Sequence, residues 1–133
     1  MVTETQRPGE AAIANAELEA LPNPSPHRDY TIEMSFPEFT CKCPRTGYPD
    51  FATITLSYVP AQYICELKSW KLCLNKFRDQ YIFHEAATNR ILDEFVDAIR
   101  PARAEIVADW SVRGNVKTVI RAEYCAPGES EIR

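Results

Sequence analysis

Apolar and polar residues alternate along three stretches of the chain, which is the pattern of a β-strand with one buried face. The stretches cover residues 30–36, 52–58 and 104–112, and residues 116–124 are expected to form a fourth strand as the partner of the third. In the first three the apolar positions are Tyr30, Ile32, Met34 and Phe36, then Ala52, Ile54, Leu56 and Tyr58, and then Ala104, Ile106, Ala108, Trp110 and Val112. Pro37 ends the first strand or marks it as an edge strand, because proline has no N–H to donate.

The middle of the chain changes to a helical period. One apolar face consists of Trp70, Cys73, Leu74 and Phe77, and a second consists of Leu92, Phe95, Val96 and Ile99. We expect residues 79–81 to separate the two helices, the second helix to start near His84, and Pro101 to end it.

The predicted order of elements is therefore ββααββ. The second pair of strands is closed by Gly114-Asn115, where glycine can take a positive φ without steric cost. This order predicts an α+β fold in which an antiparallel sheet carries both helices on one face. A sheet of four strands has exposed edges, which are hazards unless another subunit pairs with them, so we expect an oligomer.

Residues 1–28 differ from the rest in composition. They are rich in Ala, Glu, Pro and Asn, and prolines at alternate positions (Pro22, Pro24 and Pro26) favour extended backbone. We interpret residues 1–28 as a mobile arm or a partner-binding strap, and residues 29–133 as a single folded domain.

Composition narrows the class of protein. The chain has 133 residues, a net charge of −4, 45% hydrophobic residues and 26% charged residues, which are ordinary values for one globular domain. The acidic balance argues against direct nucleic-acid binding. The sequence contains neither a transmembrane run nor a secretory signal, and it has an odd number of cysteines, five. These features predict reduced thiols in a cytoplasmic protein with no membrane partner.

The candidate chemistry is concentrated between Cys41 and Asp50. Cys43 lies between Lys42 and Arg45, and nearby cations favour the reactive thiolate, so Cys43 is a candidate nucleophile. The alternative is a small buried apolar residue. We interpret Cys41 as packing. A zinc site using the Cys41-x-Cys43 pair would need further ligands, which no C-x-x-C spacing supplies, so we expect no metal.

Other titratable residues have both a functional and a structural interpretation. Asp50 would be partly desolvated by Tyr48 and Phe51, which would raise its pKa and make it a proton donor, or it is a turn aspartate. His84 could relay a proton, and Glu85 could accept two N–H bonds from a purine-like ring, or they are a partly exposed His and a helix cap.

Basic residues are candidates for phosphate binding. Lys68 and Lys71 share a helix face and could hold phosphates, or form a solvated surface. Arg113 with Gly114 could bind a phosphate in the second hairpin. Glu66 near a helix start also suits the helix dipole without any functional role.

Taken together, these motifs resemble the NADPH-dependent 7-cyano-7-deazaguanine reductases, the QueF nitrile reductases of the short single-module type. The similarity spans roughly residues 30–125. The matching segments are Glu38-Phe39-Thr40, Cys43-Pro44-x-Thr46-Gly47-x-Pro49-Asp50-Phe51-Ala52, Glu66-x-Lys68-Ser69-x-Lys71-Leu72, Phe77-Arg78, Phe83-His84-Glu85 and Arg113-Gly114.

The resemblance implies a tunnelling fold whose sheets join side by side into an oligomeric barrel, such as two stacked rings of five subunits, with active sites at subunit interfaces. It implies reduction of the nitrile of 7-cyano-7-deazaguanine to an aminomethyl group, with NADPH as cofactor, in queuosine biosynthesis for tRNA modification. Cys43 would form a covalent thioimide with the nitrile carbon, Asp50 would supply a proton, and His84 would assist.

The resemblance also assigns binding residues. Those for the substrate would be Cys65, Glu66, Leu67, His84 and Glu85, and those for NADPH would be Leu67, Lys68, Ser69, Lys71, Arg113 and Gly114. The chain departs from the family pattern at Leu67, where Ser is common, and at Asn115, where Gly is usual, and Cys41-Lys42 is an unusual pair before the nucleophile. Two alternatives stay open: a related tunnelling-fold pterin or purine enzyme such as a zinc-dependent cyclohydrolase, and a non-catalytic purine-binding module.

Overall fold

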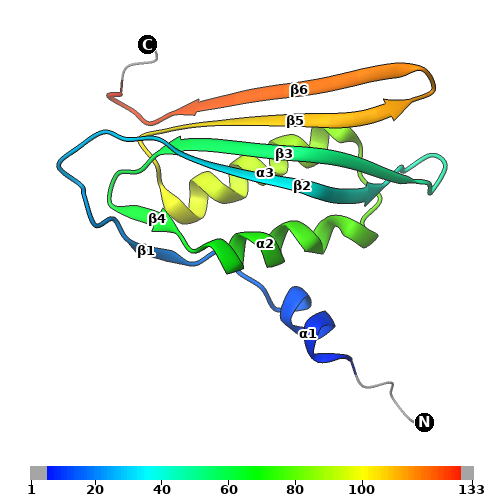
Figure 1. The fold of residues 1–133 in the computed structure, drawn as a ribbon, viewed down its shortest axis with the longest axis horizontal. Helices are drawn as coiled ribbons and strands as arrows, with labels where there is room; N and C mark the ends of the chain where they lie inside the picture. Colours follow the sequence, from blue (N-terminus) through cyan, green and yellow to red (C-terminus); the bar gives the residue numbers. More distant parts are fainter. Residues whose placement is uncertain (1–5, 130–133) are drawn as a thin grey trace.

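Four long strands form one antiparallel sheet in the order β2-β3-β5-β6 (Figure 1). The strands are β2 (Ile32–Lys42), β3 (Pro49–Val59), β5 (Arg103–Arg113) and β6 (Val116–Cys125). The structure is a computed structural model and describes residues 6–129. The order places β2 and β6 at the two edges and confirms the predicted pair of hairpins.

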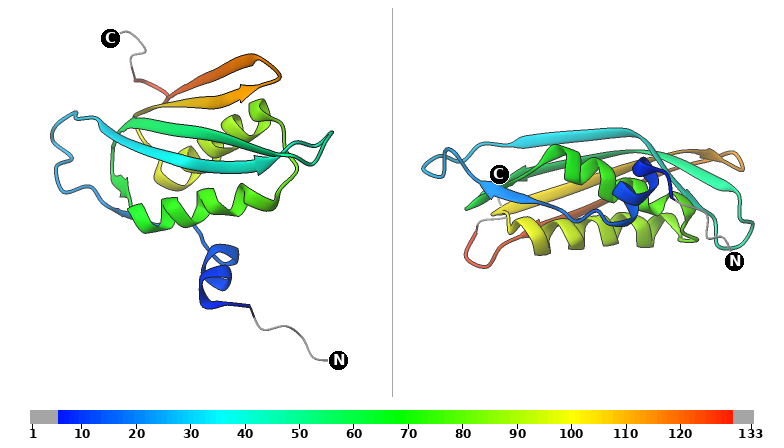
Figure 2. Two further views of the ribbon diagram at one scale, coloured as in Figure 1. Left: turned by 45° about the vertical axis from the view of Figure 1, so that its right-hand side comes forward. Right: turned by 90° about the horizontal axis from the view of Figure 1, so that it is seen from below.

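The helices lie on one face of this sheet, as predicted (Figures 1 and 2). They are α2 (Leu67–Asn75), a 3-10 turn η1 (Lys76–Asp79) and α3 (His84–Ile99). Both oxygens of the Glu66 carboxylate accept backbone N–H bonds at the start of α2, from Lys68 at 2.9 Å and Ser69 at 2.7 Å. The side chain of Glu66 therefore serves as the N-cap of α2, at the helix start where the sequence placed it.

The core lies between the helices and the sheet. The inward side chains of the two central strands are nearly inaccessible to solvent because both helices cover them. They include Ala52, Ile54, Leu56 and Tyr58 from β3 and Ala104, Ile106, Ala108 and Trp110 from β5. Every second residue along these parts of β3 and β5 is therefore buried, as the alternation in the sequence predicted.

The region before residue 29 is built into the fold more than its composition suggested. It contains the helix α1 (Pro8–Ala14) and the strand β1 (Ala20–Pro22), which pairs antiparallel with β4 (Tyr63–Cys65). The side chain of Asn23 donates to the carbonyl of Ala61 at 2.8 Å and accepts from Ser25 N–H and the Tyr30 hydroxyl. The folded unit therefore begins well before the predicted boundary at residue 29. The prediction for residues 1–5 lies outside the described residues.

β2 continues past Pro37 to Lys42, because one extra residue bulges out between Phe36 and Phe39. Proline is tolerated there because β2 is an edge strand, which was one of the two predicted options. The continuation pairs Cys41 with Asp50 and Lys42 with Pro49. Only residues 43–48 therefore form the connecting turn, instead of the longer link that the sequence suggested.

β5 has a similar irregularity. Its register against β6 shifts by one residue between Trp110 and Arg113. The side chain of Val112 is 65% exposed, so the prediction that it continues the buried face is wrong. The following turn is as predicted, with positive φ at both Gly114 (58°) and Asn115 (69°), which matches the right-handed twist of the strands.

No helix within residues 6–129 is long and apolar enough to cross a membrane.

Candidate active site

The turn between β2 and β3 folds tightly around Cys43. The Cys43 N–H donates to the carbonyl of Tyr48 at 2.9 Å, and the Cys43 carbonyl accepts from Gly47 N–H at 2.8 Å. Gly47 takes a φ of 75°, which an L-residue with a side chain rarely adopts. Glycine at this position therefore lets the turn close and fixes the direction of the Cys43 side chain.

The thiol of Cys43 is held as a thiolate near neutral pH. Its pKa is lowered from 9.0 to about 6, mainly by a hydrogen bond from the Thr46 hydroxyl, then by the Arg113 guanidinium and by the backbone N–H groups of Thr46 and Arg45. Each of these donors favours the charged sulfur. The residue is 8% exposed in the single chain. A nucleophile of this kind was the prediction for Cys43, although the donors differ from the expected flanking cations.

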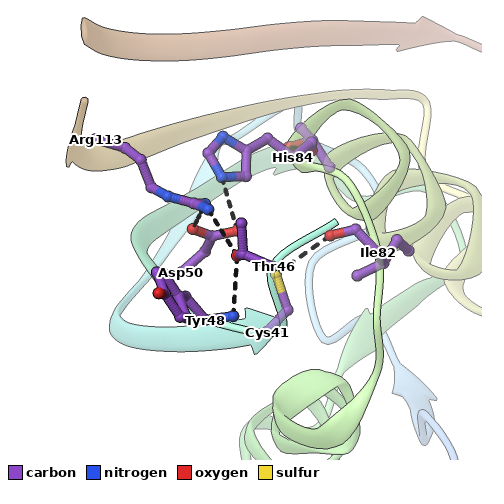
Figure 3. A network of polar contacts seen from close by, with 8 residues as sticks. Cys41, Thr46, Tyr48, Asp50, Ile82, His84 and Arg113 are labelled. Carbon is purple, nitrogen blue, oxygen red and sulfur yellow. Dashed lines mark hydrogen bonds and ion pairs between the residues drawn. The ribbon is translucent and has the colours of Figure 1, made fainter. Parts of the chain in front are cut away.

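Thr46 is oriented by its own hydrogen bonds. Its Oγ1 accepts from the backbone N–H of Tyr48 at 3.1 Å and from Nη2 of Arg113 at 3.2 Å (Figure 3). A hydroxyl has two acceptor lone pairs and one proton. With both lone pairs used, the proton of Thr46 is free to point toward the sulfur of Cys43.

The Asp50 carboxylate joins two basic side chains. It is 4% exposed, its Oδ1 accepts from Nη1 of Arg113, and its Oδ2 lies 3.1 Å from Nε2 of His84. These contacts come from three separate elements, β3, β5 and α3, which converge at one end of the sheet (Figure 3). The prediction that Tyr48 and Phe51 surround the Asp50 carboxylate is wrong. The side chains of Tyr48 and Phe51 are 67% and 53% exposed, and the carboxylate contacts Arg113 and His84 instead.

The bulge in β5 explains how Arg113 reaches this site. In a regular strand, residues an odd number of positions apart point to opposite faces, so Arg113 would point away from the helix side that Trp110 occupies. The extra residue between them reverses this, and the guanidinium contacts Asp50 and Thr46. The resemblance predicts a cofactor contact for Arg113, and the structure adds a contact with the predicted catalytic residue Asp50 and a hydrogen bond that lowers the pKa of Cys43.

His84 is the first residue of α3, and its ring is stacked on Trp110. The two ring centroids are 3.9 Å apart with an interplanar angle of 3°. The neighbouring Glu85 is exposed, and its carboxylate has no partner within residues 6–129. His84 therefore contacts a predicted catalytic residue, while Glu85 is free to bind a ligand.

Cys41 does not take part in this network. It is fully buried, and burial raises the pKa of its thiol to about 12. Its S–H points to the carbonyl of Ile82 at 3.8 Å. This agrees with the interpretation of Cys41 as a packing residue.

Cys65 and the start of α2, where most of the other predicted site residues lie, are at the opposite end of the sheet. The Cys65 N–H donates to the Tyr58 hydroxyl at 2.9 Å. Tyr58 is eight residues beyond Asp50 on β3, which is about 26 Å at about 3.3 Å per residue. The segment Cys65–Ser69 and Lys71 on α2 are therefore not brought together with Cys43 within one chain (Figure 1).

This second group contains both accessible and engaged side chains. Leu67 is 64% exposed, and Lys68 and Lys71 are exposed with no ion-pair partner among residues 6–129. Ser69 is buried, and its hydroxyl donates to the Glu66 carbonyl and accepts from the Glu19 N–H. Cys65 is buried as well, and burial raises the pKa of its thiol to about 12. The two lysines thus fit a phosphate-bearing cofactor, whereas the Ser69 hydroxyl is used locally.

Exposed aromatic rings surround the Cys43 end. They are Tyr48 (67%), Phe51 (53%), Tyr81 (65%) and Phe83 (51%). Such exposed rings mark a surface that binds a flat ligand or another protein surface. No group of three or more His, Cys, Asp or Glu side chains within residues 6–129 is arranged to hold a metal ion.

Sequence reasoning missed Thr46 and Trp110 as site residues. Thr46 lay inside the Cys43–Asp50 motif, and its spacing of three from Cys43 was an available signal for a turn that folds back. Trp110 offered no such signal, because its position in the alternating pattern of β5 predicts only burial.

The fold and site together define an α+β protein with an activated cysteine at one end of its sheet, and comparisons with known proteins agree. The family model described as QueF-like protein matches residues 49–129. The chain is 58% identical to the NADPH-dependent 7-cyano-7-deazaguanine reductase of Aquifex aeolicus, covering 91% of this chain and 94% of that protein. It is 52% identical to the Gloeobacter violaceus enzyme of the same name, covering 90% and 88%.

Among solved structures, the archaeosine synthase QueF-Like in its apo form superposes with a TM-score of 0.63 at 18% identity, covering 71% of this chain and 91% of that one. This likeness concerns the fold alone. On the family match and the similarity of the relatives, the chain belongs to the QueF family.

Proposed function

We propose that this protein reduces the nitrile group of 7-cyano-7-deazaguanine to an aminomethyl group, with NADPH as the hydride donor, in queuosine biosynthesis. The observation that carries the proposal is a cysteine with a pKa of about 6 next to an aspartate that contacts a histidine. Nitrile carbon is electrophilic, and a thiolate is the nucleophile suited to it. The names of the relatives at 58% and 52% identity support the same reaction.

In the proposed mechanism the Cys43 thiolate attacks the nitrile carbon. A carbon–sulfur bond forms, one carbon–nitrogen π-bond breaks, and the electron pair moves to nitrogen, which takes a proton and leaves a covalent thioimide. Asp50 delivers this proton after its carboxylate has taken it from His84, whose Nε2 lies 3.1 Å from Oδ2 of Asp50. The Arg113 guanidinium, which contacts Asp50 and lowers the pKa of Cys43, keeps the free nucleophile charged.

When bound, NADPH supplies two hydride equivalents, one per molecule, and each also requires a proton. The exposed ammonium groups of Lys68 and Lys71 fit its phosphates, and Leu67 offers an exposed apolar side chain beside them. The exposed Glu85 carboxylate fits the N–H groups of the deazaguanine ring. The thiolate leaves after the first reduction, and exclusion of water by the site protects the imine that remains.

The active site is proposed to form between subunits. Tyr58, whose hydroxyl contacts Cys65, lies about 26 Å along β3 from Asp50, so Cys43 and the segment that begins at Cys65 are too far apart in one chain to contact one substrate. A neighbouring subunit that pairs with a sheet edge, with its Cys65 end beside Cys43, completes the site. The ring of exposed aromatic side chains around Cys43 supports such an interface.

The reaction is tested by mixing protein, NADPH and 7-cyano-7-deazaguanine while following nicotinamide absorbance. We expect oxidation of NADPH that depends on the nitrile, and without NADPH a covalent adduct of the substrate's mass on Cys43. Cys43→Ala should abolish both. Full turnover by Cys43→Ala would exclude the covalent mechanism, and ring binding without any NADPH oxidation would indicate a binding module instead.

The shared site is tested by mixing two inactive variants, Cys43→Ala and Leu67→Glu, after dissociation and reassembly. Random assembly gives each interface an intact Cys43 and an intact Leu67 segment in about a quarter of cases, so about a quarter of wild-type activity should return. A site contained in one chain would leave the mixture inactive.

A further inference from the structure

We propose that Trp110 is a positioning residue for proton transfer, acting through His84. This rests on the proposed role of His84 and Asp50. The indole is fully buried at the last regular position of β5, just before the bulge. The imidazole of His84 stacks on the face of the indole, with ring centroids 3.9 Å apart and an interplanar angle of 3°.

The indole is itself rigidly held. Phe39 meets it edge to face, with centroids 5.8 Å apart and an interplanar angle of 85°, and Phe77 packs behind Phe39 at 5.5 Å. The Trp110 Nε1–H has no hydrogen-bond partner among the described residues, so the orientation of the ring comes from packing alone. A ring placed in this way serves as a fixed surface for whatever lies on it.

Two constraints on His84 follow from this arrangement. Stacking fixes the plane of the imidazole, and the 3.1 Å contact between Nε2 and Oδ2 of Asp50 fixes its direction within that plane. Without the stack, the ring could rotate about χ2, a broad torsion for histidine, and turn Nε2 away from Asp50.

The stack covers only one face of the imidazole, so its edge stays directed at Oδ2 of Asp50, where a proton can pass between the two groups. The guanidinium of Arg113 binds the opposite oxygen of this carboxylate, Oδ1.

The chain offers a matched control. Trp70 is also buried, at 5% exposure, and its Nε1 also lacks a partner within residues 6–129, but it packs edge to face against Phe36 and not against His84. Trp70→Leu therefore removes a similar buried volume without touching the stack. Trp110→Phe keeps an aromatic face, and Trp110→Leu removes it.

The first measurement uses proton NMR of the wild-type protein. The chain has two histidines, His27 and His84, so their ring signals can be assigned with a His27→Asn variant. Protons above an indole face are shielded, so His84 should resonate upfield of His27. This shift should persist in Trp70→Leu, diminish in Trp110→Phe and vanish in Trp110→Leu. Unshifted His84 signals in the wild-type protein would overturn the proposal without any Trp110 variant.

The second measurement is steady-state kinetics with the nitrile and NADPH. We expect turnover in Trp110→Leu to fall about tenfold with little change in the KM for the nitrile, and Trp110→Phe to recover most of it. A merely structural role predicts that Trp70→Leu and Trp110→Leu lose turnover equally, and that result would refute the proposal. If Trp110→Leu does not fold, the comparison of Trp110→Phe with Trp70→Leu decides. Failure of the wild type to reduce the nitrile would refute the proposed function while leaving the NMR result intact.

Discussion

The hydroxyl of Thr46 offers the sharpest test of how this protein activates its cysteine. Thr46→Val keeps the shape of the side chain and removes the one proton that points to Cys43. The hydrogen bond from this hydroxyl is the largest of four contributions that lower the pKa of Cys43 from 9.0 to about 6. The matched control is Thr46→Ser, which keeps the hydroxyl and removes only a methyl group.

The size of the effect follows from the titration. If four donors share the total lowering roughly evenly, losing the largest moves the midpoint of thiolate formation up by about one pH unit. The thiolate fraction then falls from about a half to about a tenth at pH 6, about a fivefold loss, but by less than about twofold at pH 7. The defect should therefore be large in mild acid and nearly absent at pH 8.

The assay is the ultraviolet absorbance of the thiolate against pH, taken as a difference from Cys43→Ser. Cys41 and Cys65, whose pKa values are raised to about 12 by burial, stay protonated in this range. The rate of adduct formation with the nitrile in the absence of NADPH should follow the same curve. If Thr46→Val and Thr46→Ser titrate at the wild-type midpoint, the hydroxyl does not stabilise the thiolate, and the reasoning fails.

Three further outcomes are expected. Asp50→Asn should still bind the nitrile but slow turnover about 100-fold or more, because the proton donor is lost, and single-turnover rates equal to wild type would remove its assigned role. Arg113→Lys keeps the charge but cannot bridge Asp50 and Thr46, so the Cys43 midpoint should rise; a change only in the KM for NADPH would restrict Arg113 to the cofactor. Asn23→Ala breaks three hydrogen bonds and should cost about 2–3 kcal/mol in urea unfolding, with Pro24→Ala as the control.

The sequence alone was enough to predict the order of the four long strands and the two main helices, together with their buried faces, but not the short strands β1 and β4. The alternation in 52–58 and 104–110 matches the burial of β3 and β5, because the faces of a strand are set by a local period of two. The turn at Gly114-Asn115 was also predictable from local sequence, because glycine and asparagine adopt positive φ more readily than other residues. Cys43, Asp50 and His84 were named as candidate site residues because they lie in short motifs, and their catalytic roles belong to the proposed function.

Only the tertiary structure decided how those residues are arranged. The bulge that turns Arg113 toward Asp50 inserts one residue without any change in the hydrophobic pattern, so alternation along β5 could not reveal it. Trp110 beneath His84 joins β5 to α3, and the Thr46 hydroxyl is directed by donors from its own turn and from β5. Each of these contacts depends on strand register and on the packing of elements distant in sequence.

The same reason explains why the predicted site residues separated into two groups. Motifs record which residues are present, but only the fold places Cys43 beside the start of β3, where Lys42 pairs with Pro49, and Cys65 near its end, against Tyr58. Residue types and local periods were therefore determined by the sequence, since they arise from neighbouring positions. Distances between motifs, and with them the proposed need for a second subunit, were decided by the fold, because they arise from pairing across the chain.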